Sequence, residues 1–162
     1  MMDISVSTYD NFLRLGPVRS ADMRPRDYVP ALPQIDLTGA NPRLNATKCG
    51  RCAMLFLERP MRCLNCFSDE LSIVKLGSGG TISSYTIVYR SFTGVKTPFI
   101  MVVVKMDDGI YLRGRLESFN PDTEHPRYGE KVSLVFWDSE QTDADGRRYI
   151  AYAFRKNVER FL

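Results

Sequence analysis

The sequence is poor in the residues from which catalytic sites are usually built. It has one histidine, His125, and its four cysteines all fall between residues 49 and 66. A Ser-His-Asp or Cys-His arrangement could therefore form only around His125, and we interpret this side chain as a solvated loop residue. Gly77-Ser78-Gly79-Gly80 is followed by neither Gly-Lys-Ser/Thr nor a helical pattern, which excludes a phosphate-binding loop. We expect no catalytic residues in this chain.

Long apolar runs and a strong charge of either sign are also missing. Phe99–Val104 is a typical apolar run, and none approaches the ~20 residues that span a bilayer. The first residues, MMDISVSTYDNF, show no basic start followed by an apolar run, so we expect a cytoplasmic protein with no membrane contact. The 22 basic and 19 acidic residues leave a net charge of +3. This mild excess fits a mixed solvated surface and falls short of the bias of a dedicated nucleic-acid binder.

The four cysteines form two hooks, Cys49-x2-Cys52 and Cys63-x2-Cys66, separated by ten residues. Each C-x-x-C turn points two sulfurs at one spot, and four thiolates match the tetrahedral preference of zinc. In a chain without a secretory signal, such hooks indicate a metal rather than disulfides. Catalytic zinc sites keep one position open, so four cysteines indicate one structural zinc ion per chain. An iron centre of rubredoxin type would use the same ligands, and we favour zinc.

Proline dominates the segment before the cysteines. Residues 11–15 could belong to a short helix, but prolines at 17, 25, 30 and 33 exclude a continuous helix after it. Apolar side chains such as Tyr28, Leu32 and Ile35 are out of place in a solvated linker. We therefore predict that residues 1–45 form an arm that packs either on its own domain or on a partner.

After the cysteines the pattern changes to strands. Runs rich in β-branched and aromatic residues are separated by turn signals, among them Asp108-Gly109 and Asp145-Gly146. The five runs are Thr81–Arg90, Phe99–Met106, Ile110–Glu117, Lys131–Asp138 and Tyr149–Arg155. Five short strands favour a small barrel of the OB-fold type, although an SH3-like barrel fits almost as well. We predict a mostly β chain with the arm at 1–45, a zinc ribbon at 46–76 and a five-stranded OB-fold barrel at 77–162, with Trp137 in its core.

The order of these motifs resembles a prokaryotic family, long classed as a domain of unknown function, that joins a rubredoxin-like zinc ribbon to an OB-fold. The resemblance runs from Cys49 to about Lys156. It rests on CGRC at 49–52, RPMRCLNC at 59–66, GSGGTISSYTIVYR at 77–90, TPFIMVVVKMDDGIYLRGRL at 97–116 and YGEKVSLVF at 128–136. Two departures stand out: Ala53 replaces a glycine that the family often has, and Pro60 stands alone where the family often has a double proline. The arm also differs from the paired helices common in the family.

The resemblance implies a companion subunit. Proteins of this family are typically partners of thiolase-like or lipid-transfer-like enzymes that make or break carbon–carbon bonds in acyl-CoA compounds, and they usually carry no catalytic residues. This chain is therefore expected to belong to a thiolase- or aldolase-type complex. The chain is then expected to form a hetero-oligomer with a thiolase-like protein, and its barrel is expected to assist assembly or to contact CoA. Cations would hold the CoA phosphates and an aromatic surface its adenine. The candidates for this contact are Arg90, Phe92, Arg113, Arg115, Lys48, Arg51 and Arg62.

Two other classes of protein remain open. The first is a single-stranded nucleic-acid-binding module, since OB-fold barrels bind single strands through stacked aromatic rings and a basic groove. Its candidate residues are Tyr85, Tyr89, Phe92 and Tyr111 together with Arg90 and Arg113. The mild net charge and the lack of a dense basic run argue against it. The second is a free-standing iron electron carrier, which a red colour of the purified protein would reveal.

Overall fold

A computed structural model describes residues 27–39, 41–117 and 119–157 of the chain, and every regular element in these ranges is a strand. The prediction of a mostly β chain is confirmed, whereas the short helix predicted at 11–15 lies outside the described residues. The strands are β1 (Tyr28–Pro30), β2 (Ile35–Asp36), β3 (Arg43–Cys49), β4 (Leu55–Phe56), β5 (Leu71–Lys75), β6 (Gly79–Val88), β7 (Phe99–Met106), β8 (Tyr111–Glu117), β9 (Lys131–Thr142) and β10 (Arg148–Lys156). No helix that is long and apolar enough to cross a membrane occurs in the described part of the chain.

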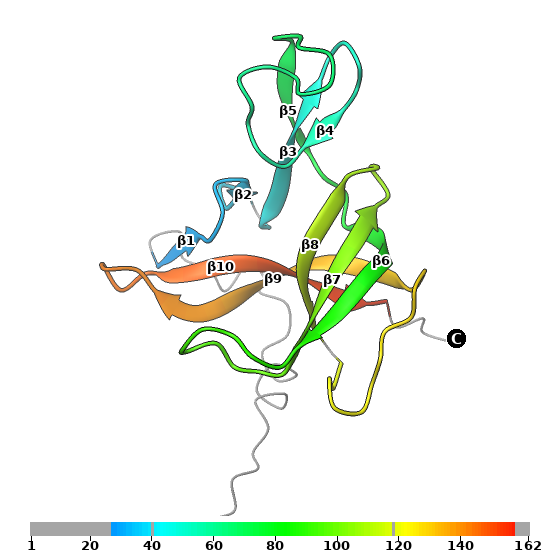
Figure 1. The fold of residues 1–162 in the computed structure, drawn as a ribbon. Coiled ribbons are helices and arrows are strands. Elements are labelled where there is room, and N and C mark those ends of the chain that lie inside the picture. Colours follow the sequence, from blue (N-terminus) through cyan, green and yellow to red (C-terminus); the bar gives the residue numbers. More distant parts are fainter. Residues whose placement is uncertain (1–26, 40, 118, 158–162) are drawn as a thin grey trace, which may run out of the picture.

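Strands β6 to β10 close into a barrel (Figure 1). The pairs β6–β7, β7–β8, β6–β9 and β9–β10 are antiparallel, and β8–β10 is parallel, so each of the five strands has two neighbours. This pairing is the closed five-stranded pattern of the OB-fold. All five predicted strands are present. Strand β9 extends to Thr142 rather than ending at Asp138, and β6 begins at Gly79, two residues before the predicted start at Thr81.

Alternation along the strands fills the barrel interior. Ile100, Val102 and Val104 on β7 are almost completely buried, and Phe154 on β10 has no exposed surface. Gly80 lies where β6 pairs with both β7 and β9, and a Cβ atom there would come within 2.5 Å of a Val104 methyl carbon. Only glycine fits this close approach of strands. The prediction that Trp137 belongs to the core is wrong: Val132 and Leu134 on β9 point inward, and Trp137, at the opposite parity, is half-buried.

The described end of the arm packs on its own chain. Strand β1 runs parallel to β10, with Tyr28 opposite Arg148 and Pro30 opposite Ile150. The Arg148 guanidinium lies 5.3 Å from the centre of the Tyr28 ring, in a cation–π contact. Of the two arrangements that the sequence leaves open for the arm, residues 28–30 adopt packing on their own domain.

A second, smaller sheet projects from one end of the barrel (Figure 1). Strand β3 is its centre and pairs antiparallel with β2, β4 and β5. Leu44 and Ala46 on β3 are buried in the same apolar cluster as Leu76 and the barrel residues Ile82 and Met106. The core is therefore continuous from the barrel into the base of this sheet. We call residues 43–75, which contain β3 to β5 and the cysteine hooks, the ribbon.

Candidate metal centre and barrel groove

The two cysteine hooks have the same backbone structure. In the first, the Cys49 N–H donates to the Met54 carbonyl (3.0 Å) and the Ala53 N–H donates to the Cys49 carbonyl (3.0 Å). In the second, the Cys63 N–H donates to the Ser68 carbonyl (2.8 Å) and the Phe67 N–H donates to the Cys63 carbonyl (2.9 Å). The residue after each second cysteine adopts a left-handed backbone, with φ of 59° at Ala53 and 58° at Phe67. This explains why the resembled family often has glycine at the position of Ala53.

All four sulfurs converge on one point, and any two of them lie within 4.8 Å of each other. The shortest separations cross between the hooks, at 3.6 Å from Cys49 to Cys66 and 3.5 Å from Cys52 to Cys63. A disulfide needs a sulfur separation of about 2.05 Å, so the cysteines are free thiols in this arrangement. A tetrahedron with metal–sulfur bonds of about 2.3 Å has edges of about 3.8 Å. The four cysteines therefore fit a tetrahedral thiolate site for a metal such as zinc.

Two of the four thiols, Cys52 and Cys66, have pKa values shifted in opposite directions. Hydrogen bonds to the sulfur of Cys52, first from the Asn65 side chain and then from the Met54 backbone, lower the pKa of Cys52 to about 6. The Ser68 backbone lowers the pKa of Cys66, but burial and the three neighbouring cysteines outweigh it and raise that pKa to about 12. The thiolate form is thus favoured at Cys52 and disfavoured at Cys66. A bound divalent cation would favour the thiolate form at each ligand, because metal-coordinated thiols are deprotonated.

The hook region has almost no core of its own. Between Cys49 and Glu70 the buried side chains are Cys49 and Cys63, and all others are partly or fully exposed. Strands β3 and β5 pair over residues 45–49 and 71–75, which anchors the two ends of the segment but not its middle. Leu55 and Leu57 are partly buried against the main apolar cluster, so within the described structure the cysteine cluster is the one fully buried centre of this segment.

A groove of about 750 Å³ lies on the barrel, between the β6–β7 loop and the outer parts of β9 and β10. Lys96 comes from the loop, Arg115 from β8, Trp137, Ser139 and Gln141 from β9, and Tyr149 from β10. The volume is in the range of small-molecule sites, which are commonly about 300–1,000 Å³. Two cationic and two aromatic side chains in one groove suit a ligand that has both anionic groups and a flat ring.

The Arg115 side chain is held on two sides. Its guanidinium carbon lies 5.1 Å from the centre of the Phe99 ring, and its Nε lies 3.2 Å from a carboxylate oxygen of Glu117. Burial raises the pKa of Glu117, although the charges of Arg115 and Arg155 act in the opposite direction. Arg115 is thus presented to the groove from a fixed position.

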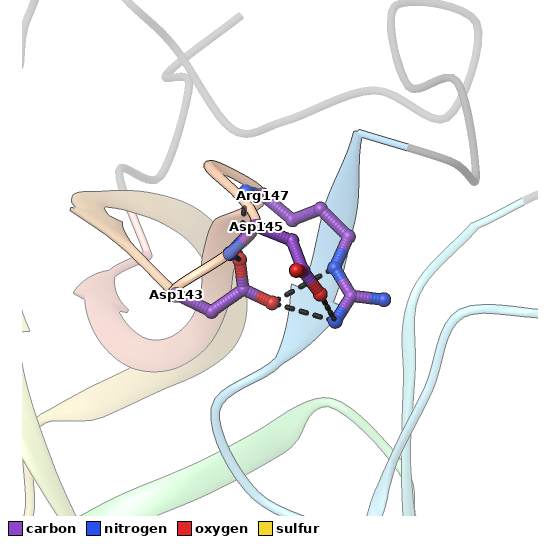
Figure 2. Close-up of polar contacts among 3 residues, drawn as sticks. All are labelled: Asp143, Asp145 and Arg147. Carbon is purple, nitrogen blue, oxygen red and sulfur yellow. Dashed lines mark hydrogen bonds and ion pairs between the residues drawn. The ribbon is translucent and has the colours of Figure 1, made fainter.

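The turn between β9 and β10, beside the outer end of the groove, is braced by charges (Figure 2). The Arg147 Nε donates to an Asp143 carboxylate oxygen at 2.8 Å, and the Arg147 guanidinium also pairs with Asp145 at 3.1 Å. The Asp143 side chain in turn accepts the backbone N–H groups of Asp145 and Arg147. These contacts hold the turn in one shape and support the ends of both strands.

The sequence candidates for a ligand contact are only partly brought together. Arg115 lines the groove, whereas the other six, Arg90, Phe92, Arg113, Lys48, Arg51 and Arg62, are exposed elsewhere in the described structure. Of the candidates for nucleic-acid stacking, Tyr89, Phe92 and Tyr111 are exposed, and Tyr85 packs against Tyr128 with ring centres 5.7 Å apart. Lys96, Trp137 and Tyr149 were missed, because no local pattern shows that three separate segments meet.

The fold and the cysteine cluster together define an OB-fold protein with a four-cysteine ribbon. Residues 73–136 match the family described as the C-terminal OB-fold domain of ChsH2. The resemblance to a family with an OB-fold domain is thereby confirmed over these residues, and the four cysteines lie clustered before them.

Similar proteins support the same assignment. The chain is 27% identical over 127 residues to the benzoylsuccinyl-CoA thiolase subunit BbsA of Geobacter metallireducens, covering 78% of this chain and 84% of that protein. It is 26% identical over 131 residues to the subunit of the same name from Thauera aromatica, covering 78% and 85%. The solved Ltp2-ChsH2(DUF35) aldolase has the same fold, with a TM-score of 0.59 and 22% identity over 72% of this chain and 86% of that one.

Proposed function

We propose that this chain is a non-catalytic subunit that assembles with a thiolase-like or aldolase-like enzyme acting on acyl-CoA compounds. The observation that carries the proposal is the extent of the similarity to BbsA, a thiolase subunit by name. An alignment that covers 78% of a 162-residue chain includes residues 37–126 wherever it begins. The segment that holds the cysteine hooks and three of the five barrel strands therefore both lie within the region of similarity to that subunit. The proposal assigns no catalytic residue to the chain and makes it a required part of the complex.

We propose zinc as the metal, held by Cys49, Cys52, Cys63 and Cys66. The sulfur separations and the closed four-thiol set support a structural site with no open coordination position. Zinc bound there supplies folding energy to the ribbon rather than chemistry to a substrate. Metal analysis of purified protein tests this directly: one zinc per colourless chain is expected, and a red protein with one iron would replace zinc by a rubredoxin-type centre.

We propose that the barrel groove is where CoA contacts this chain. Lys96 and Arg115 can bind the phosphates, and Trp137 and Tyr149 can receive the adenine ring. Trp137 is the only tryptophan in the sequence, so its fluorescence reports on the groove alone. Titration with CoA should quench or shift this signal with a saturating curve, and Arg115→Gln should weaken the response. A response to single-stranded oligonucleotides instead, lost with rising salt, would favour the nucleic-acid module.

The subunit proposal itself is tested by recovering the chain with a tag from its native host at moderate salt. Mass spectrometry should find a thiolase-like or aldolase-like protein in near-stoichiometric amount. Recovery of nuclease-sensitive RNA or DNA in its place would contradict the proposal and support the nucleic-acid module. Recovery of the chain alone at every salt concentration would also contradict it.

A further inference from the structure

Four large apolar side chains stand exposed around the cysteine cluster: Met54, Met61, Leu64 and Phe67. Their exposed fractions are 43%, 97%, 71% and 72%. Each lies within two residues of a cysteine, and the cysteine sulfurs lie within 4.8 Å of one another, so the four residues surround one end of the ribbon. We call this set the ribbon tip. Large apolar side chains gathered at one exposed place mark a contact surface.

Phe67 combines exposure with an unfavourable backbone. Its φ of 58° lies in the left-handed region, where a bulky residue is rare. Glycine would relieve the strain and would also remove an exposed aromatic ring from water. Packing within the ribbon does not account for the ring, because 72% of the side chain is exposed. The left-handed backbone is the hook geometry that Phe67 shares with Ala53, and it fixes the direction in which the exposed ring leaves the second hook.

The charges around the tip indicate what kind of surface would cover it. Arg51, Arg59 and Arg62 are all exposed, and so are the acidic residues Glu58, Asp69 and Glu70 of the same segment. The tip combines methionine and an aromatic residue with neighbouring arginines, and these are the types enriched at protein–protein interfaces. The arginine fork pairs with carboxylates in a bidentate way. A complementary surface is therefore an apolar hollow bordered by carboxylates.

We propose that the ribbon tip docks into such a hollow on the thiolase-like partner, with Phe67 as the central anchor. This inference rests on the proposed function and adds the surface through which the two subunits meet. An anionic membrane would also attract apolar and arginine side chains, but a lipid surface accepts apolar groups in many orientations. Anionic lipids would also repel the exposed carboxylates of Glu58, Asp69 and Glu70 in the same segment. A protein pocket can pair with both signs of charge, and interface anchors act through close packing in desolvated pockets.

The test compares Phe67→Gly with a matched control in the full-length chain. Glycine suits the backbone at position 67, so the variant should bind one metal per chain and unfold at a temperature no lower than wild type. Tyr128→Ser removes an aromatic side chain of equal exposure, 72%, from the barrel. The thiolase-like subunit recovered with the tagged chain is purified, and its affinity for each variant is measured by biolayer interferometry. Phe67→Gly should weaken binding by about 30-fold or more, as loss of an interface anchor does, and Tyr128→Ser should not weaken it.

Each other outcome has a separate meaning. If wild type and Phe67→Gly bind the partner equally, the ribbon tip is not the docking surface, and the subunit function still stands. If wild type binds no thiolase-like protein, the proposed function fails and this inference fails with it. Sedimentation with vesicles of phosphatidylglycerol and phosphatidylcholine identifies the remaining occupant. Wild-type binding to these vesicles that Phe67→Gly loses would assign the tip to membranes and overturn the proposal.

Discussion

Removal of the metal should unfold the hook region and leave the barrel intact. Between Cys49 and Glu70 the only fully buried side chains are Cys49 and Cys63, and hydrophobic burial is limited to the partly buried Leu55 and Leu57. Fixing a backbone costs about 1–2 kcal/mol per residue. A structural zinc ion in a small thiolate site contributes roughly 10–16 kcal/mol at neutral pH. Zinc bound at the proposed site would therefore be the dominant stabilising interaction of this segment, and its loss would not be offset locally.

The barrel has a different source of stability. Its five strands close on one another, and Phe154, Val102 and Val104 at its centre have no exposed surface. None of these residues touches the cysteine cluster, so chelation should not reach them. Zinc removal with a strong chelator under reducing conditions, or the substitution Cys63→Ser, should thus produce a chain with an ordered barrel and an unfolded hook region.

Hydrogen exchange followed by mass spectrometry measures the two parts separately. Peptides from residues 49–70 should exchange at the rate of an unfolded chain after zinc removal, while peptides from β7 and β8 keep their protection. Leu64→Ser provides a control, because it changes a 71% exposed side chain inside the second hook and leaves all four sulfurs in place. Protected hook amides in metal-free protein, or full metal content in Cys63→Ser, would refute the reasoning. Loss of barrel protection together with the hooks would show that the two parts fold as one unit.

Three further predictions concern single positions. Gly114→Ala would place a Cβ 2.9 Å from a ring carbon of the fully buried Phe154. Urea denaturation should therefore show that the free energy of unfolding falls by about 1–3 kcal/mol, and the second substitution Phe154→Leu should restore part of it. An unchanged free energy of unfolding would contradict the packing. Ala53→Gly should raise stability by roughly 0.5–1 kcal/mol, because the left-handed backbone costs alanine roughly 1–2 kcal/mol and glycine loses about 0.5–1 kcal/mol in chain entropy; a lower melting temperature would argue against it. Burial raises the pKa of Glu117 above its ordinary 4.5, so protonation of this side chain should stabilise the folded state. The stability of wild type relative to Glu117→Gln should therefore increase as the pH falls from 7 toward 4.5. A stability difference that does not change with pH would contradict this prediction.

The barrel strands could be predicted because turn chemistry and alternation are local. Gly109 and Gly146, each after an aspartate, adopt φ of 92° and 79° in the turns of the β7–β8 and β9–β10 hairpins. Each demands the flexible backbone that an Asp-Gly pair signals. The parallel pairing of β1 with β10 could not be predicted, because Tyr28 and Arg148 are 120 residues apart and neither sequence specifies its partner. The wrong prediction for Trp137 has a simpler reason. Side chains alternate between the two faces of β9, and Trp137 lies on the face opposite to the buried Val132 and Leu134.

The two candidate sites differ in how much of them the sequence contains. The metal cluster is built from two short hooks whose spacing already fixes where the sulfurs point. The groove is built from a loop, an inner strand and an outer hairpin, which place Lys96, Arg115 and Tyr149 together only after the barrel has closed. Arg115 was named from its charge alone, and its fixed position depends on Phe99 and Glu117, which no charge pattern reveals. A site formed by residues close together in the sequence could therefore be predicted, and a site formed by residues from distant segments could not.

The arrangement also separates the role of the metal from that of the groove. The ribbon projects from one end of the barrel, while the β6–β7 loop that walls the groove lies at the other (Figure 1). No residue is shared between the cysteine cluster and the groove lining. A metal held by four thiolates has no free position for a substrate atom, so a ligand in the groove would meet only cations and aromatic rings of the barrel. In the assembly proposed above, the ribbon presents its tip to a partner and the barrel presents its groove to a ligand. An assembly subunit that also contacts the substrate of its enzyme needs these two surfaces to be independent, because each must remain accessible while the other is occupied.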